Sequence, residues 1–342
     1  MLDRSGAIAY TNAKIHGMLP KSFIGSRVTK LFSVNSVTEL WSVLFDEELP
    51  NVPELLLAKK IEQKALERFI AQYKKLLETY TKPYGILSVL LQYYEYENLK
   101  KIGASLSLGK KELPQIIDIS PYSFLNYNAW PDIAGITEAT PFSWYNSVPE
   151  IQDIQYMDNR LDLQYIKSLW SSLDELPSSE KKPIREFILE SIVLKNILWV
   201  LRLKVYYDMK TEDILGRLVY ENDKHLETDL FAGPAIMIVN WDVKDYSVWS
   251  EWKYSDCVNQ KVDADKWCID PCYVGQCFRK RENASALAKF HQYPLSIMAL
   301  VSWFKIKQNE YKNICAAVEA VRLGVEESLA MELTGATPAK KR

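Results

Sequence analysis

The chain has 342 residues, 48% of them hydrophobic and 25% charged, which is typical of a globular protein and excludes a disordered one. Lysine and arginine number 42, and aspartate and glutamate number 44, so the net charge of -2 gives no general attraction to nucleic acid. A chain of this length can form two or three domains.

No transmembrane helix is expected, because spanning a bilayer requires roughly 20 consecutive apolar residues. The apolar segment 192–205 is interrupted by two lysines, an asparagine and an arginine, and the segment that begins at Pro294 stops at Lys305. The N-terminus also lacks a recognisable signal peptide. We therefore expect any membrane association to go through a partner protein, and we expect the five cysteines to be free thiols in a reducing compartment.

Helical patterns dominate the chain, with apolar residues recurring at the spacing of one helix face. A proline at a first-turn position opens the first long helix, Pro83 ends it, and a serine-rich capping segment before Pro183 opens another. We predict long helices, arranged as helical hairpins, over 52–80, 84–106, 178–207, 262–290 and 294–322.

Three of these helices share one pattern. Each contains an asparagine followed at once by an aliphatic residue and then by a basic stretch, and about a dozen residues later a glycine or aspartate breaks the helix. The asparagines are Asn98, Asn196 and Asn313, and the breaks are Gly109, Asp208 and Gly324. One helical unit used three times suggests a scaffold or collar before it suggests an enzyme.

The asparagines lie in apolar stripes. Large apolar residues flank Asn98 and Asn196 at helical spacing, whereas the stripe around Asn313 is weaker. A buried amide without a partner costs about 1–3 kcal/mol, so it persists only when it is hydrogen-bonded, and it then fixes helix register. We predict a structural role in helix register, with a ligand or partner contact as the alternative, for Asn98, Asn196, Arg202 and Asn313.

Residues 114–148 differ from the rest of the chain. Four prolines punctuate this segment, which has no sustained helical period. Its aromatic residues (Phe124, Tyr127, Trp130 and Trp144) favour an ordered insertion over a flexible linker. We expect a first helical repeat over 1–113, this insertion over 114–148, a second repeat over 149–222, a third over 223–333 and a flexible tail over 334–342.

Motifs for chemistry are weak. Residues 103–110 look like a phosphate-binding loop, but the glycine spacing is wrong and Lys111 stands where a magnesium-binding Ser or Thr is needed. A zinc site could use four of a group of five residues, yet the group lacks zinc-site spacing, and small buried cysteines explain it as well. Its members are Cys257, Cys268, Cys272, Cys277 and His291. With few histidines and solvated carboxylates for acid–base chemistry, we predict no catalytic, cofactor or metal site.

The order and spacing of four stretches resemble the C subunit of bacterial and archaeal V/A-type rotary ATPases, whose eukaryotic counterpart is the d subunit. The stretches are residues 10–15 followed by Phe32, residues 94–100 with an acidic-x-x-Asn-Leu-Lys element, Asn196-Ile197 followed by Leu-Arg-x-Lys over 201–204, and residues 294–296 followed by Lys307, Glu310 and Asn313-Ile314. The resemblance covers about residues 7–330. The insertion at 114–148 and the cysteines at 268–277 depart from the family pattern, so no partner contact is carried over to them.

This resemblance implies an all-α fold of three similar helical bundles in a pseudo-threefold, funnel-like arrangement. It implies a non-catalytic protein without a cofactor, present in one copy per complex, cytoplasmic, and peripheral to the membrane through the complex. Members of this family couple the central shaft (the D and F proteins of the complex) to the membrane proteolipid ring during ATP-linked proton or sodium transport. From the charge balance and the interrupted apolar segments we expect no binding of nucleic acid and no direct insertion into the membrane.

Two alternatives stay open at this point. One is a cytosolic helical adaptor protein unrelated to rotary motors, and the other is a metal-dependent helical enzyme that uses the region 257–291. The enzyme would need a bound metal or a cluster of groups with perturbed pKa values in a pocket. The adaptor would need partners other than the ring and shaft proteins, so co-purification from solubilised membranes separates these hypotheses.

Overall fold

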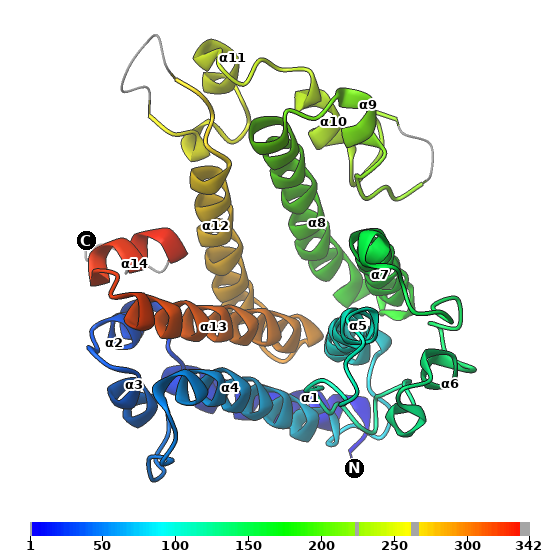
Figure 1. The fold of residues 1–342 in the computed structure, drawn as a ribbon, viewed down its shortest axis with the longest axis vertical. Helices are drawn as coiled ribbons and strands as arrows, with labels where there is room; N and C mark the ends of the chain where they lie inside the picture. Colours follow the sequence, from blue (N-terminus) through cyan, green and yellow to red (C-terminus); the bar gives the residue numbers. More distant parts are fainter. Residues whose placement is uncertain (1, 223–225, 261–266, 336–342) are drawn as a thin grey trace. The chain divides into compact units, whose positions relative to one another are not determined.

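The structure is a computed structural model, and it describes residues 2–222, 226–260 and 267–335. Within these ranges the chain forms helices and no β-strand, and its one extended contact is an isolated bridge between Leu2 and Tyr80 (Figure 1). The predicted all-α fold is therefore confirmed.

The helices differ widely in length. The long ones are α1 (Arg4–Met18), α4 (Glu54–Leu77), α5 (Gly85–Ser107), α7 (Ile154–Ser171), α8 (Ser178–Tyr207), α12 (Pro271–Gln292) and α13 (Ile297–Leu323). The shorter ones are α2 (Thr29–Phe32), α3 (Val37–Leu44), α6 (Ile133–Thr137), α9 (Thr211–Leu215), α10 (Gly233–Val239), α11 (Tyr246–Ser250) and α14 (Glu327–Thr334).

The predicted long helices correspond to α4, α5, α8, α12 and α13. Helix α12 begins later than predicted, because Asp270 caps it by accepting a hydrogen bond from the Cys272 N–H and because Pro271 occupies its first turn. The predicted start of this helix, residues 262–266, lies outside the described residues. Helix α7 is not among the predicted helices, since polar residues fill most of its surface and only Leu161, Tyr165, Ile166 and Leu169 are buried.

Each of the three predicted helix breaks adopts the left-handed backbone conformation. The φ angles are +66° at Gly109, +47° at Asp208 and +63° at Gly324. These residues follow the ends of α5, α8 and α13, where a left-handed residue ends a helix and where glycine, and less often aspartate, is tolerated. The positions predicted for the breaks are confirmed.

The chain folds into two compact units. Unit 1 comprises residues 1–11 and 67–181, and unit 2 comprises residues 12–66 and 182–342. Helix α4 contributes to both units, and the boundaries of the three repeats stay a prediction.

In unit 1, α5 packs along α7, so the helix that precedes α8 is paired with α5. The ring of Tyr96 lies 4.8 Å from that of Phe142 and 5.4 Å from that of Tyr165. Gly103 permits a close approach on the same helix, because a Cβ there would lie 2.0 Å from the Tyr145 hydroxyl oxygen. Gly103, which in the sequence looked like the first glycine of a phosphate-binding loop, therefore has a packing role.

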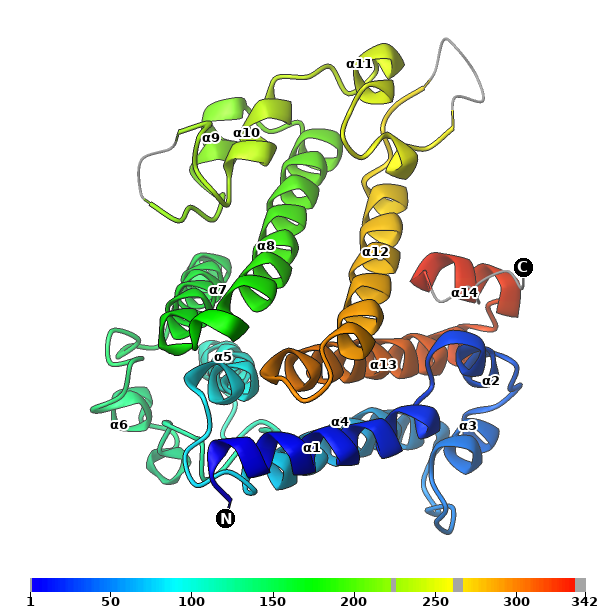
Figure 2. The same ribbon diagram turned by 180° about the vertical axis from the view of Figure 1, so that it is seen from behind.

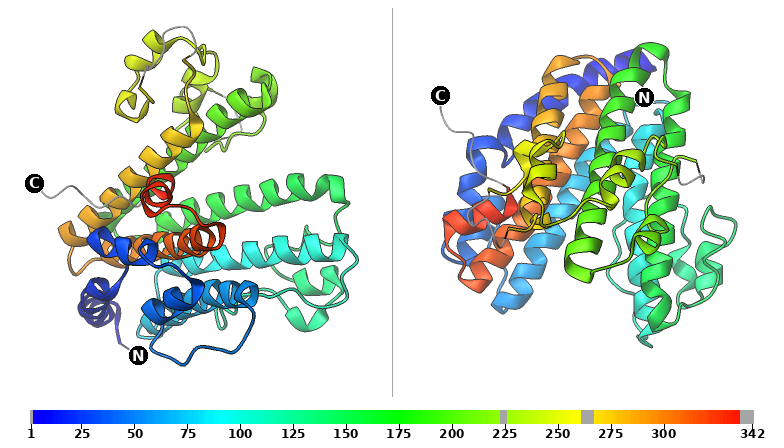
Figure 3. Two further views of the ribbon diagram at one scale, coloured as in Figure 1. Left: turned by 60° about the vertical axis from the view of Figure 1, so that its left-hand side comes forward. Right: turned by 90° about the horizontal axis from the view of Figure 1, so that it is seen from above.

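In unit 2, α12 and α13 pack against each other, and Figures 1 and 2 show the two helices crossing near the short connection between them. One apolar cluster joins α8, α12 and the segment between them that contains α9 to α11, with Trp249 fully buried. A second cluster joins α2, α3 and the first half of α4 with the end of α13 and α14 (Figure 3). These clusters hold the C-terminal ends of α8 and α13 in place.

Candidate functional site

Asn98 is fully buried on α5, and its side chain forms hydrogen bonds with the first residues of the 114–148 segment. Its Nδ2 donates to the backbone oxygen of Ile117 (2.8 Å) and to the hydroxyl of Tyr127 (2.9 Å). Its Oδ1 accepts from the N–H of Ile117 (2.9 Å). One side-chain amide thus satisfies both polar backbone groups of a buried residue 19 positions later in the chain.

Glu95 lies one helical turn before Asn98 and is also fully buried. Its carboxylate accepts hydrogen bonds from Ser123 Oγ (2.5 Å), from the Phe124 N–H (2.5 Å) and from the Tyr127 hydroxyl (2.9 Å). Burial, and next the Glu95 charge, raises the pKa of Tyr127 above its ordinary range, so this hydroxyl stays protonated and can donate. Tyr127 therefore joins Glu95 and Asn98 in one network with satisfied partners.

Further contacts close the segment on unit 1. Ser107 Oγ donates to the backbone oxygen of Pro149 (2.6 Å), and Trp144 Nε1 donates to Gln164 Oε1 (2.7 Å). Trp130 Nε1 donates to the backbone oxygen of Lys111 (3.0 Å). Of the aromatic residues of this segment, Tyr127, Trp130 and Trp144 form hydrogen bonds through their polar atoms, whereas Phe124 is 44% exposed.

Asn196 repeats this arrangement on α8, where its side chain is 2% exposed. Its Nδ2 donates to the backbone oxygens of Val219 (2.8 Å) and Phe231 (3.0 Å), and its Oδ1 accepts from the Val219 N–H (3.0 Å). The pairing of one amide with both backbone groups of one residue is the same as at Asn98. Val193, which is apolar, occupies the position that Glu95 has on α5.

The loop that is hydrogen-bonded to Asn196 contains a carboxylate of its own, whereas α8 has no carboxylate at the position of Glu95. Asp229 accepts hydrogen bonds from four backbone N–H groups: those of Glu221 (3.3 Å), Asn222 (3.1 Å), Phe231 (2.9 Å) and Ala232 (2.9 Å). Burial alone would raise the pKa of Asp229, but these four donors outweigh it and hold the pKa below its ordinary value. In the loop bonded to Asn196, the charged carboxylate of Asp229 therefore satisfies the backbone N–H groups.

The basic residue that anchors the chain after α8 is Lys204. Its Nζ donates to the backbone oxygens of Val239 and Trp241, both at 2.6 Å, at the C-terminal end of α10, where a positive charge is favourable. Burial lowers the pKa of Lys204, and Asp242 opposes that change. Arg202, which the sequence analysis selected, is exposed and lies over Gly275 of α12, so its role in helix register stays a prediction.

The third helix is anchored differently. Asn313 is 4% exposed, but within the described ranges its side chain forms no hydrogen bond. Glu310, one turn earlier and 5% exposed, accepts from the backbone N–H of Phe23 (2.8 Å) and pairs with Lys307. Glu95 and Glu310 both lie three residues before their asparagine, and the carboxylate of each accepts a hydrogen bond from a backbone N–H, so the acidic-x-x-Asn element on which the resemblance depends holds a backbone group at both places.

The ends of the three asparagine helices expose apolar side chains. Leu108, Tyr207 and Leu323 each lie directly before the left-handed residue, and they are 60%, 71% and 72% exposed. Isolated exposed apolar residues are ordinary on protein surfaces. Their common position, one residue before the left-handed residue, is a shared feature of these helix ends.

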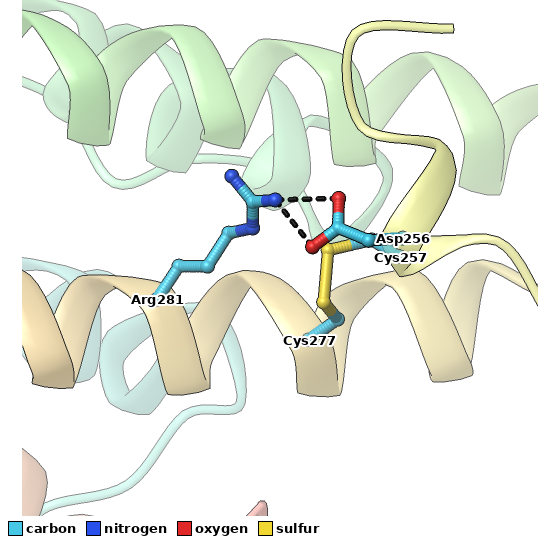
Figure 4. Close-up of a disulfide and its surroundings, with 4 residues drawn as sticks. All are labelled: Asp256, Cys257, Cys277 and Arg281. Atoms are coloured by element: carbon cyan, nitrogen blue, oxygen red, sulfur yellow. Dashed lines mark hydrogen bonds and ion pairs between the residues drawn. A yellow bond between two sulfur atoms is a disulfide. The ribbon is translucent and has the colours of Figure 1, made fainter. Parts of the chain in front are cut away.

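Cys257 and Cys277 form a disulfide, which corrects the expectation of free thiols for these two residues (Figure 4). It joins the short helical turn Ser255–Cys257 to α12. The side chain of Asp256, beside it, pairs with Arg281 of α12. The free cysteines among the described residues are Cys268, Cys272 and Cys315.

The disulfide also contradicts the zinc hypothesis for this region. Asp256, Cys257 and Cys277 are the one group in the described part of the chain whose ligand atoms lie close enough for a metal. Two of its three members are consumed by the disulfide, and a metal needs thiolates. The ring of His291 packs 5.1 Å from Phe290 and 6.2 Å from His16, away from that group.

The described helices were also tested as membrane spans. None of them combines the length and the apolar character that crossing a bilayer demands.

Comparison with known proteins places this arrangement in a family. Residues 11–232 match the model of the ATP synthase (C/AC39) subunit. An uncharacterised protein of Treponema pallidum is 26% identical over 336 residues, which cover 98% of each chain. The C subunit of the A-type ATP synthase of Thermococcus gammatolerans is 23% identical over 96% of this chain and 89% of its own, and that of Methanococcoides burtonii is 24% identical over 74% and 69%. The chain belongs to the ATP synthase (C/AC39) subunit family.

Proposed function

We propose that the chain is a non-catalytic central-stalk subunit of a V/A-type rotary ATPase, which couples the central shaft to the membrane proteolipid ring. The observation that carries this proposal is the extent of the match to the Thermococcus protein, which covers 96% of this chain and 89% of the relative.

The geometry of the helix ends supports a mechanical role. A coupling protein must resist twisting, so the chain that leaves each helix has to be tied back to that helix. Asn98 and Asn196 do this by pairing with the backbone of Ile117 and Val219. Long helices packed through interlocking side chains add stiffness along their axes.

The remaining details of the proposal follow the resemblance. The chain is organised as three helical repeats, one copy serves each complex, and the protein lies on the cytoplasmic side, peripheral to the membrane. Its direct partners are the proteolipid ring and the D and F proteins of the shaft. In this role the four residues Asn98, Asn196, Arg202 and Asn313 keep helices in register rather than contact a substrate.

Co-purification tests this proposal most directly. The affinity-tagged chain is expressed in the organism that encodes it and extracted from membranes with a mild detergent. The proteolipid ring and the shaft proteins should co-purify with it in fixed proportion. The same tag on an unrelated helical protein serves as the control. Recovery of other partners, with no ring or shaft protein, would support an adaptor and refute the proposal.

Deletion of the gene gives a functional readout. Membrane vesicles from the deletion strain should lose ATP-driven ion transport, while the detached catalytic sector still hydrolyses ATP, because coupling is lost rather than catalysis. Transport at the wild-type rate would contradict a coupling role. Restoration of transport by the intact chain, supplied from a plasmid, controls for effects on neighbouring genes.

A further inference from the structure

Two segments of the chain share one sequence pattern: a proline, any residue, a serine, a phenylalanine and an aliphatic residue. They are residues 20–24 (Pro-Lys-Ser-Phe-Ile) and residues 121–125 (Pro-Tyr-Ser-Phe-Leu). The second segment lies in the insertion that follows α5, whereas the first lies near the N-terminus, between α1 and α2. Both segments meet a carboxylate on a long helix.

A buried glutamate binds the phenylalanine N–H of each segment. On α5, Glu95 Oε2 accepts from the Phe124 N–H (2.5 Å) and Glu95 Oε1 accepts from Ser123 Oγ (2.5 Å). On α13, Glu310 Oε1 accepts from the Phe23 N–H (2.8 Å). Each glutamate lies three residues before an asparagine of its helix, so the same position of the helix meets the same position of the segment.

The serine on α13 is reached through a lysine. Lys307 pairs with Glu310, and its Nζ donates to Ser22 Oγ (3.3 Å). On α5 the corresponding position, three residues before the glutamate, is taken by the neutral Gln92. Glu310 is 5% exposed, and a buried carboxylate needs donors and a positive charge, which Phe23 and Lys307 supply.

Other contacts join the same part of the chain to α13. The ring of Phe23 packs against the apolar cluster that contains α2 and the end of α13, and these two helices pack against each other (Figures 1 and 2). The N–H of Leu295, just before α13, donates to Asn12 Oδ1 on α1 (3.2 Å). Contacts between residues 12–32 and α13 therefore begin at the start of α13 and continue into its C-terminal half.

The bond between Phe23 and Glu310 joins the two ends of the chain. These residues are 287 positions apart, and α13 is the last of the long helices in the described chain. The ends of a chain loosen first unless they are tied down. A protein that transmits torque must not open between its first and its last elements, and this contact is where such an opening is prevented.

We propose that Glu310 is a positioning residue for coupling, because it fixes the segment 20–24 on α13 as Glu95 fixes the segment 121–125 on α5. The role in coupling rests on the function proposed above, whereas the docking of the segment does not. Without the carboxylate, residues 19–28 separate from α13, and the chain no longer carries load between its two ends.

Hydrogen exchange of the intact chain tests the docking. In Glu310→Leu the Phe23 N–H loses its acceptor, so exchange over residues 19–28 should rise about tenfold. The control Glu319→Leu removes an exposed glutamate of α13 that pairs with Arg322, also three residues away, and should leave exchange over this segment unchanged. Wild-type exchange in Glu310→Leu overturns the docking.

Two further variants keep the test decisive if the first one folds poorly. Ser22→Ala leaves α13 intact and removes the hydroxyl that is bonded to its lysine, so exchange over residues 19–28 should rise by a smaller factor. Glu95→Leu should raise exchange at Phe124, because the equivalent carboxylate is removed. Wild-type exchange in both of these variants overturns the shared docking.

Transport in membrane vesicles gives a readout that a structural role alone would not change. Vesicles from the deletion strain carry the wild type, Glu310→Leu, Glu310→Gln or Glu319→Leu, and the ratio of ion transport to ATP hydrolysis is measured. The ratio should fall about threefold or more in Glu310→Leu while the variant stays bound to the complex. Glu310→Gln, whose side-chain oxygen can still accept from the Phe23 N–H, should recover much of the ratio, and Glu319→Leu should match the wild type.

The outcomes separate the positioning role from the proposed function. Raised exchange together with a wild-type transport ratio in Glu310→Leu overturns the role in coupling, and so does loss of this variant from the complex. If the wild-type chain recovers no ring or shaft protein and restores no transport, the proposed function fails, while the exchange measurements still decide the docking.

Discussion

The segments that follow α5 and α8 are held in the same way where they begin and in different ways where they end. After α5, the segment 109–149 is held by hydrogen bonds at both ends, from Asn98 at the start and from Ser107 to Pro149 at the end. After α8, the segment 208–270 is held by Asn196 at the start and by the disulfide to α12 at the end.

The supporting carboxylates differ in the same way. Glu95 projects from α5 into its loop, whereas Asp229 belongs to the loop and gathers the loop's own N–H groups. The shared element is the amide that pairs with one backbone residue, and the charge that satisfies the remaining donors can come from either side. Helices α5 and α8 therefore share the amide anchor and differ in the charged group that surrounds it.

The largest expected effect is from Asn98→Leu. Leucine matches asparagine in size but leaves the N–H and C=O of Ile117 without partners and removes the donor to Tyr127. We expect a loss of about 4 kcal/mol in the free energy of unfolding of unit 1, since each buried unpaired group costs roughly 1–3 kcal/mol. Urea unfolding, with hydrogen exchange at 114–130 to locate the change, measures it.

Two variants calibrate that result. Asn196→Leu should cost about 1 kcal/mol less than Asn98→Leu, because its loss does not disturb a buried helix carboxylate such as Glu95. Gln92→Leu, at a partly exposed amide of α5, should cost little. Equal costs for Asn98→Leu and Gln92→Leu would refute the anchoring role.

Removal of the disulfide between Cys257 and α12 is expected to cause the second largest loss of stability. Cys257→Ser with Cys277→Ser opens a cross-link between residues 20 positions apart, and loop-closure entropy gives about 3 kcal/mol for a loop of this size. Unit 2 should lose stability while unit 1 keeps it. Cys272→Ser, which removes an exposed free thiol of α12, is the matched control.

Reduction offers an independent check on the same bond. A dithiol reductant should lower the melting temperature of the wild type and leave that of the double serine variant unchanged. Free-thiol counting before and after unfolding would expose an error: five reactive thiols in the unfolded, unreduced chain would mean that the disulfide is absent.

Asp229→Ala is expected to cost about 2 kcal/mol, because it leaves four loop N–H groups without their charged acceptor, some of which water then satisfies. The pKa of Asp229 is lower in the folded protein than in the unfolded chain. The stabilisation is therefore fully present at pH values above the pKa of the unfolded chain, and it is lost as the pH falls through the pKa of the folded protein. The gap between wild type and variant should therefore narrow below about pH 4. A gap that widens in acid would contradict the assigned charge.

The helices and their ends were predictable because their signals are local. Gly109, Asp208 and Gly324 could be located, since a left-handed residue after an apolar helix needs glycine or one of the few residues that tolerate it. The burial of Asn98 and Asn196 followed from the apolar stripe on which each lies.

The partners of those residues were not predictable for a physical reason. Ile117 and Val219 accept and donate through the backbone, which carries no side-chain signature. The disulfide was missed because the approach of Cys257 to α12 depends on how the preceding turn packs against Phe278 and Trp252. The reducing compartment had been inferred from the lack of an export signal, which does not determine whether two cysteines meet.

The smallest expected effect separates two basic residues that the sequence could not rank. Lys204→Met removes the donor to the Val239 and Trp241 carbonyls at the end of α10 and should cost about 1 kcal/mol, because this end is partly open to water. Arg202→Met, two residues earlier and exposed, should cost less than about 0.5 kcal/mol. Parallel urea titrations measure both variants. If Arg202→Met proves the more damaging, the register role predicted for Arg202 is supported, and the anchoring role assigned to Lys204 is wrong.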